Sequence, residues 1–280
     1  MSLKAKKFYL FRVKLIRDHQ KDMFDDGASR ANILATAINE RPSIKLKRGA
    51  EWRLANINPI GVNGGSFAIG RISQASTEKF DFEANKFVER QDMQGPFAAV
   101  FFDTSIGVIA IEDKSKVNSK IEITARRLHD LLQNTRAITS RNIACRVDKI
   151  MDPQGFIQKI MDCSHVLKFR ATFTGPNPID ADAIFQKPLE VYAEATNAER
   201  GVIEVIGSNL DKESLIEVTR SNAATGNVVS AKIETRGLVE NIPLKGLPAS
   251  FNTLQNEEEA FVYNLMQERY AQVRHADNTD

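Results

Sequence analysis

Apolar and polar side chains alternate near the start of the chain, and this pattern predicts a β-strand over residues 8–16. Because successive side chains of a strand point to opposite faces, Phe8, Leu10 and Arg12 share one face. The other face begins at Tyr9 and is apolar. The first predicted element is therefore a strand that carries basic side chains among apolar ones.

Helix spacing and turn residues define the elements that follow. Ser29 is positioned to cap a helix over 30–39. Beyond it lies a long β-rich section, in which an Asn-Gly-Gly sequence at 63–65 predicts a hairpin turn. Nearly continuous apolar runs at 97–102 and 107–112 predict a buried hairpin in the middle of a sheet. The other strands predicted in this section cover residues 43–46, 51–58, 66–73, 79–82 and 86–91.

The second half of the chain alternates between strand and helix patterns. Residues 202–206 fit either a strand or an extension of a helix. Gly and Pro residues at 237–248 predict a linker. Helices are predicted over 118–133, 155–163, 180–197, 210–220 and 254–273, and strands over 142–150, 165–174 and 227–236.

These elements predict an α+β fold with two mixed, largely antiparallel sheet domains and packed helices. We expect a basic first domain over residues 1–141 and a second, self-associating domain over 142–239. The linker before the last helix is long enough to cross back, so residues 240–280 are expected to return to the first domain.

Composition is typical of a folded domain, with 42% hydrophobic and 26% charged residues. The first apolar run is broken by Arg12 and Lys14, and no run is long enough to span a membrane, so we expect a cytoplasmic protein. The two cysteines, Cys145 and Cys163, form no paired motif, and the four histidines are scattered. This pattern predicts buried free thiols, no zinc site and no cofactor.

The formal net charge of +2 conceals an uneven distribution. Residues 1–144 hold 24 Lys and Arg against 16 Asp and Glu, a net charge of +8, whereas 145–280 hold 14 against 20, a net charge of −6. Within the second half, 142–239 has a net charge of −2 and 240–280 of −4. A basic domain with an acidic tail is consistent with two interpretations. The domain binds an external polyanion, or the domain and the tail pair with each other through their opposite charges.

Three basic groups in the first domain suggest where a polyanion binds. If they merge into one stripe, they neutralise phosphates without reading bases; otherwise they are three separate solvated surfaces. Trp52 lies near the second group and is either a base-stacking residue or a half-buried sheet residue. The candidate DNA-contacting residues are Lys6, Lys7, Arg12, Lys14, Arg17, Lys45, Lys47, Arg48, Arg53, Arg126 and Arg127.

One pattern resembles an enzyme site. Asp103 precedes an apolar strand that ends in Glu112 and Lys114, the order in which many metal-dependent nucleases place a cation-binding pair of carboxylates and a lysine. The alternative is an ordinary charged strand end. A Mg²⁺-dependent nuclease is thus a second functional hypothesis, and a non-enzymatic assembly module is a third.

The segment Phe101-Phe102-Asp103-Thr104-Ser105-Ile106-Gly107-Val108 and the strand-helix-strand block at 145–178 resemble the RexA family of phage exclusion proteins. The resemblance implies a two-domain homodimer that binds DNA without strong sequence preference. It further implies a role as a sensor or regulator in antiphage defence, with a membrane protein as partner. The family has no diagnostic motif, so the resemblance assigns no catalytic residue.

Overall fold

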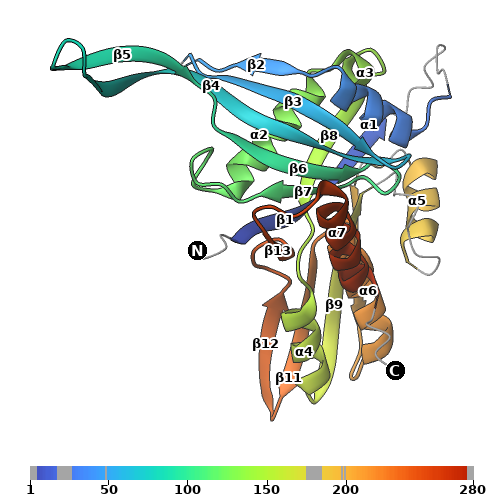
Figure 1. The fold of residues 1–280 in the computed structure, drawn as a ribbon. Helices are drawn as coiled ribbons and strands as arrows, with labels where there is room; N and C mark the ends of the chain where they lie inside the picture. Colours follow the sequence, from blue (N-terminus) through green and yellow to red (C-terminus); the bar gives the residue numbers. More distant parts are fainter. Residues whose placement is uncertain are drawn as a thin grey trace.

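The computed structural model describes residues 5–17, 27–47, 49–174, 185–196, 198 and 200–275, and its helices and antiparallel sheets confirm the predicted α+β class (Figure 1). The elements of the first half are β1 Ala5–Arg17, α1 Arg30–Asn39, β2 Ser43–Lys45, β3 Glu51–Ile60, β4 Gly64–Asp81, β5 Lys86–Gln94, β6 Phe97–Asp103, β7 Val108–Glu112, α2 Ile121–Gln133 and α3 Arg136–Thr139. Those of the second half are β8 Ile143–Lys149, α4 Gln154–Asp162, β9 His165–Thr174, α5 Gln186–Ala195, β10 Arg200–Ile206, α6 Lys212–Ala224, β11 Val229–Thr235, β12 Leu238–Pro243, β13 Ser250–Leu254 and α7 Glu259–Arg274.

The described strands form a larger and a smaller sheet. In the larger sheet the order is β13-β1-β7-β6-β4-β3-β2, with β5 paired to β4 and β8 paired to β1. In the smaller sheet the order is β10-β9-β11-β12. The hairpin of β6 and β7 lies in the interior of the larger sheet, as its apolar runs predict, and every residue of β7 is buried.

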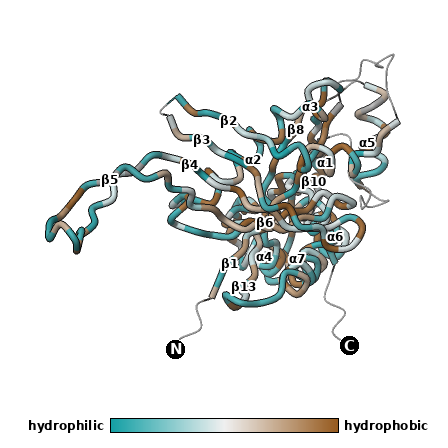
Figure 2. Tube along the Cα trace, turned by 45° about the horizontal axis from the view of Figure 1, so that its top comes forward, coloured by the Kyte–Doolittle hydropathy of each residue, from teal (hydrophilic) through white to brown (hydrophobic). Residues whose placement is uncertain are grey.

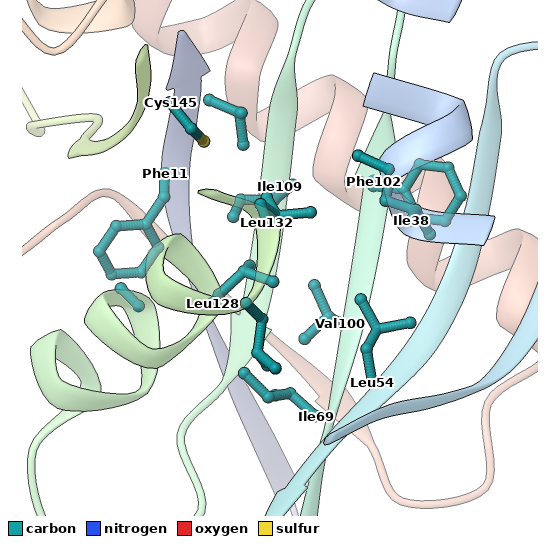
Figure 3. Packing of buried hydrophobic residues seen from close by; sticks show 14 of the residues in the cluster. Phe11, Ile38, Leu54, Ile69, Val100, Phe102, Ile109, Leu128, Leu132 and Cys145 are labelled. Atoms are coloured by element: carbon teal, nitrogen blue, oxygen red, sulfur yellow. The ribbon is translucent and has the colours of Figure 1, made fainter. Parts of the chain in front are cut away.

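Two cores lie on opposite faces of the larger sheet. Tyr9 and Phe11 of β1 belong to the first core, which is completed by α1, α2 and α3. Figure 3 shows Leu128 and Leu132 of α2 within this core, beside Ile109 of β7. The N-terminus of α1 is capped as predicted, because the Ser29 Oγ accepts a hydrogen bond from the backbone N–H of Asn32 at 3.2 Å.

The second core joins the two sheets. Phe8 and Leu10 of β1 point into it, together with Phe169 of β9 and Met266 of α7. Helix α7 packs against α6 and also contacts β13, β4 and β6, so the C-terminal helix returns to the larger sheet (Figure 1). The last helix therefore lies between the larger sheet and α6, which in turn packs against β9 and β11.

Three parts of the sequence-based prediction differ from the structure. Strand β8 pairs with β1 from Ile143 to Lys149, so the larger sheet continues beyond residue 141. The predicted linker at 237–248 contains strand β12, which pairs with β11. The prediction of a linker there is therefore wrong. Five of the six β12 residues are exposed, because β12 is an edge strand, so burial leaves no alternating pattern to read. The last helix begins at Glu259, because β13 occupies 250–254.

A two-stranded arm extends from the larger sheet (Figure 2). Beyond Ser73, β4 pairs with β5 alone, up to the Asp81–Lys86 pair. The sequence predicted two strands here, but β4 is continuous for 18 residues. None of the side chains that the structure describes in the arm is buried, so the polar run between the predicted strands did not indicate its continuity.

Both cysteines are buried free thiols, as predicted. Cys145 lies in the first core, and burial raises the pKa of its thiol to about 12. Burial also raises the pKa of the Cys163 thiol. Because the thiolate is the nucleophilic form, both side chains act as small core residues at neutral pH.

Candidate nucleic-acid interface

Arg12, a predicted DNA-contacting residue, is fully buried at 0% exposure. Its Nη1 donates a hydrogen bond to the Tyr270 hydroxyl of α7 at 2.7 Å, and its guanidinium lies 5.6 Å from the centre of that ring. Phe8 and Leu10 on the same face of β1 share the second core with α7, so Arg12 connects the returning helix to the sheet. The prediction that Arg12 contacts DNA is therefore wrong.

Lys14, the next residue on the same face of β1, is 6% exposed and is likewise wrongly assigned to an exposed stripe. Its Nζ lies 3.1 Å from an Asp148 carboxylate oxygen. It also donates hydrogen bonds to Thr174 Oγ1 at 3.2 Å and Asn227 Oδ1 at 3.1 Å. Lys14 thus connects β1 and β8 of the larger sheet to the smaller sheet.

Burial lowers the pKa of the Lys14 ammonium from 10.5 to about 8, and Asp148 offsets part of this effect. Between these pH values the unfolded chain binds more protons than the folded one, so stability rises with pH. We expect the Lys14 contribution to increase the free energy of unfolding by up to about 1.4 kcal/mol per pH unit in this window. Denaturant titrations from pH 7 to 10.5 measure the slope. Lys14→Met should flatten it, and equal slopes in both proteins would contradict the assignment.

The remaining described members of the predicted stripe lie on separate surfaces. Lys6 and Lys7 are on β1, whereas Lys45 and Arg53 are on β2 and β3 at the far edge of the sheet. Five strand spacings separate β1 from β2, a distance of about 24 Å. Lys47 follows β2 and is exposed, like Arg126 on α2. The structure therefore does not bring these residues into one continuous stripe.

Several of these cations have local partners or lie outside the description. Arg53 pairs with Glu51, and Arg127 pairs with Asp130 at 2.8 Å. The side chain of Arg17 and the whole of Arg48 lie outside the described residues. Trp52 is 2% exposed within the first core, so it is not available for base stacking.

The residues of the nuclease hypothesis lie at opposite ends of a hairpin. Asp103 pairs with Val108 next to the turn, whereas the Glu112 carboxylate accepts a hydrogen bond from the Ala99 backbone N–H at 2.9 Å. Four residues of strand separate the two carboxylates, a distance of about 14 Å. Lys114 places its Nζ 4.6 Å from the centre of the Phe97 ring. These side chains do not form a shared cation site.

The Asp103 carboxylate is fully engaged in hydrogen bonds that have a structural role. One carboxylate oxygen accepts hydrogen bonds from the Ser105 backbone N–H and hydroxyl, and the other accepts from Tyr263 and Gln267 of α7. Burial alone would raise the pKa of this carboxyl, but the hydrogen bonds outweigh burial and lower the pKa. Asp103 therefore holds α7 against the β6–β7 turn.

Cationic residues gather instead on one face of the smaller sheet. In β9, Phe169 and Ala171 point into the second core, so the alternating positions Lys168, Arg170 and Thr172 face the other way. Register places Ser230 of β11 beside Arg170, and Lys232 beside Lys168. Most residues of this face are exposed or half-buried.

Two adjoining hollows follow this face. The first has a volume of about 250 Å³ and lies between β8 and the smaller sheet; the second, of about 450 Å³, extends toward β12. Arg170 and Ser230 line both hollows. We use the name cationic sheet face for the six basic residues that line them, Arg146, Lys168, Arg170, Arg200, Lys232 and Lys245.

Much of this positive charge is not neutralised within the chain. Lys168 pairs with Glu204 at 2.9 Å, and Arg146 pairs with Asp148 at 3.1 Å. Within the described part of the chain, no carboxylate pairs with the other four members, Arg170, Arg200, Lys232 and Lys245. Lys168 and Lys232 also lie directly opposite each other, an arrangement that destabilises a sheet. The arrangement suits an external anion.

Sequence reasoning missed this face because it relied on local net charge. The segment 142–239 has a net charge of −2, which conceals basic residues that share one face. The alternation of Lys168, Arg170 and Thr172 in a correctly predicted strand was the available indication. The neighbouring strands that complete the face could be identified only from the register.

Comparison of the chain with protein-family models and with curated proteins finds no match. The resemblance to the RexA family therefore stays a prediction. Across the described ranges, no group of three or more His, Cys, Asp or Glu side chains is arranged to hold a metal ion. No helix in the described part of the chain is long and apolar enough to cross a membrane.

Proposed function

We propose that this protein binds DNA without sequence specificity, through phosphate contacts from the cationic sheet face. The observation that carries the proposal is the continuous run of six basic side chains along two adjoining hollows, against one lining carboxylate, Glu204. Lys and Arg contacts to phosphates supply affinity that depends little on sequence. The described residues that line the two hollows come from strands and loops and not from a helix, which favours backbone contacts over base reading by a recognition helix.

The biological setting that we propose is that of a cytoplasmic homodimer acting as a sensor or regulator in antiphage defence, with a membrane protein as partner. This setting is supported by the resemblance of residues 101–108 and 145–178 to the RexA family. Self-association has a further support in β12, an edge strand whose Leu238 and Val239 are 76% and 51% exposed. An edge strand with exposed apolar side chains is a suitable surface for pairing with a second copy.

A salt titration of DNA binding tests the proposal. Four to six phosphate contacts with duplex DNA should give a slope of log affinity against log salt of about −4 to −5. Affinity should fall by about 10² to 10³ between 50 and 200 mM salt. Fluorescence anisotropy with duplexes of unrelated sequence measures both the slope and the absence of sequence preference. No binding at 50 mM salt, or a slope near zero, would overturn the proposal.

A further inference from the structure

The smaller hollow of the cationic sheet face has the features of a pocket for a single anionic group. Its three arginines come from three strands, Arg146 from β8, Arg170 from β9 and Arg200 from β10. Ser230 adds a hydroxyl group to the same lining, in which the Thr172 hydroxyl bonds to the backbone of Val228. Guanidinium forks and hydroxyl donors are the groups that bind phosphate oxygens.

The inner wall of this pocket is held by a buried polar network. Thr174 and Asn227 line the pocket and are 4% and 5% exposed. Both accept hydrogen bonds from the Lys14 Nζ, so an ammonium group lies directly behind the lining. Thr174 Oγ1 and Asn227 Oδ1 are also 3.2 Å apart, which orients both side chains. The inner wall of the pocket is therefore held in place by hydrogen bonds, and it carries the Lys14 ammonium group behind it.

A glycine allows the two sheets to meet at this pocket. Gly226 has a φ of +67°, and a Cβ at this position would lie 2.7 Å from the Asp148 Cβ. Asp148 itself pairs with Lys14 and Arg146. The turn before β11 thus approaches β8 closely, and Arg146 of the larger sheet faces Arg170 and Arg200 of the smaller one.

We infer that the pocket lined by Arg146, Arg170 and Arg200 binds a phosphate monoester, the terminal phosphate of a nucleic-acid strand or of a free nucleotide. For a strand end the inference rests on the proposed function, which it deepens by naming the part of the strand that is recognised. The remaining nucleotides then follow the cationic sheet face toward Lys232 and Lys245.

Charge and shape both favour a terminal phosphate over an internal one. A phosphate monoester carries about −1.5 to −2 at neutral pH, whereas a diester carries a single charge. Arg170 and Arg200 have no carboxylate partner among the described residues, and Arg146 shares Asp148 with Lys14, so the pocket matches the larger charge. The second hollow adjoins the pocket through Arg170, which supplies a path for a chain that leaves on one side.

Fluorescence anisotropy with single-stranded oligonucleotides tests the inference. The oligonucleotides share one sequence and end in a 5′-phosphate, a 3′-phosphate or hydroxyls only. We expect one phosphorylated form to bind at least tenfold more tightly than the hydroxyl form. Arg200→Gln should reduce this ratio to about one. Ser230→Ala removes a hydroxyl that lines the pocket without changing the charge, and should reduce the ratio several-fold.

Lys245→Gln is the matched control, because it removes one charge from the second hollow and none from the pocket. It should weaken all three oligonucleotides equally and leave the ratio unchanged. Thermal melting of each variant shows whether it is folded. If wild-type protein binds all three oligonucleotides equally and binds no nucleoside monophosphate, the inference is overturned while the proposed function stands.

Calorimetry with inorganic phosphate and a nucleoside monophosphate separates the two sources of the ligand. Binding of the monophosphate alone, lost in Arg200→Gln, with no binding of any oligonucleotide, would support a nucleotide pocket and overturn the proposed function. If inorganic phosphate abolishes the preference for the phosphorylated oligonucleotide, the result would support recognition of a strand end. No binding of any phosphate compound would overturn the inference and the proposed function together.

Discussion

Replacing Arg170, Arg200, Lys232 and Lys245 together by glutamine is expected to lower the affinity for duplex DNA by about a thousandfold at 100 mM salt. These are the four members of the cationic sheet face that have no carboxylate partner among the described residues. Each lost phosphate contact reduces the salt slope by about 0.9, so the slope should fall by about 3.6. Anisotropy titrations over a range of salt concentrations measure both quantities.

The basic residues that the sequence analysis assigned to DNA binding supply a matched control variant, with the same change in net charge as the test variant. Lys45, Lys47, Arg53 and Arg126 are exposed, and all four can be replaced by glutamine. Because these residues lie on other surfaces, affinity should fall by less than about threefold, through long-range electrostatics alone. If the control variant loses as much affinity as the test variant, DNA does not bind through the cationic sheet face. Both variants should keep the melting temperature of the wild type.

Arg12→Ala is expected to lower the free energy of unfolding by about 3 kcal/mol. The substitution removes a charge-assisted hydrogen bond, leaves the buried Tyr270 hydroxyl without that donor, and empties the space of a fully buried side chain. Tyr270→Phe removes only the hydroxyl and should cost about 1–2 kcal/mol. Urea unfolding followed by circular dichroism measures both variants.

The same substitution separates a structural role from DNA contact. Below its unfolding transition, Arg12→Ala should keep the salt slope of the wild type, because Arg12 is 0% exposed. Arg53→Ala is the control for stability, since Arg53 is exposed and its ion-pair partner among the described residues is Glu51 on the same strand. It should change the free energy of unfolding by less than about 1 kcal/mol. A fully stable Arg12→Ala variant would show that the returning helix does not depend on this contact.

Much of the fold could be predicted where the pattern is local. Ser29 caps α1, β9 has its predicted limits, and the apolar runs at 97–102 and 107–112 form the interior hairpin. Prediction failed where burial does not follow alternation. The described side chains of the arm beyond Ser73 are exposed or half-buried, and β12 is an exposed edge strand, so neither shows the period that identifies a strand.

The candidate site was harder to predict than the fold, because it depends on which residues become neighbours. Arg146, Arg170 and Arg200 are separated by more than twenty residues along the chain and belong to three strands. Their convergence depends on antiparallel register and on the close approach at Gly226. Local counts of charge instead favoured β1, whose basic residues are partly internal.

The sequence alone determined the α+β class, the two faces of β1 and the free cysteines, because side-chain period and composition are local properties. Only the tertiary structure decided which faces are covered. Helix α7 lies about 250 residues after β1 and buries Arg12, whereas the face of β9 that carries Arg170 is left open. The same alternation of basic and apolar residues therefore produces an internal anchor in one strand and a candidate DNA-binding surface in the other. The physical reason is that burial depends on contacts between elements that are distant in sequence.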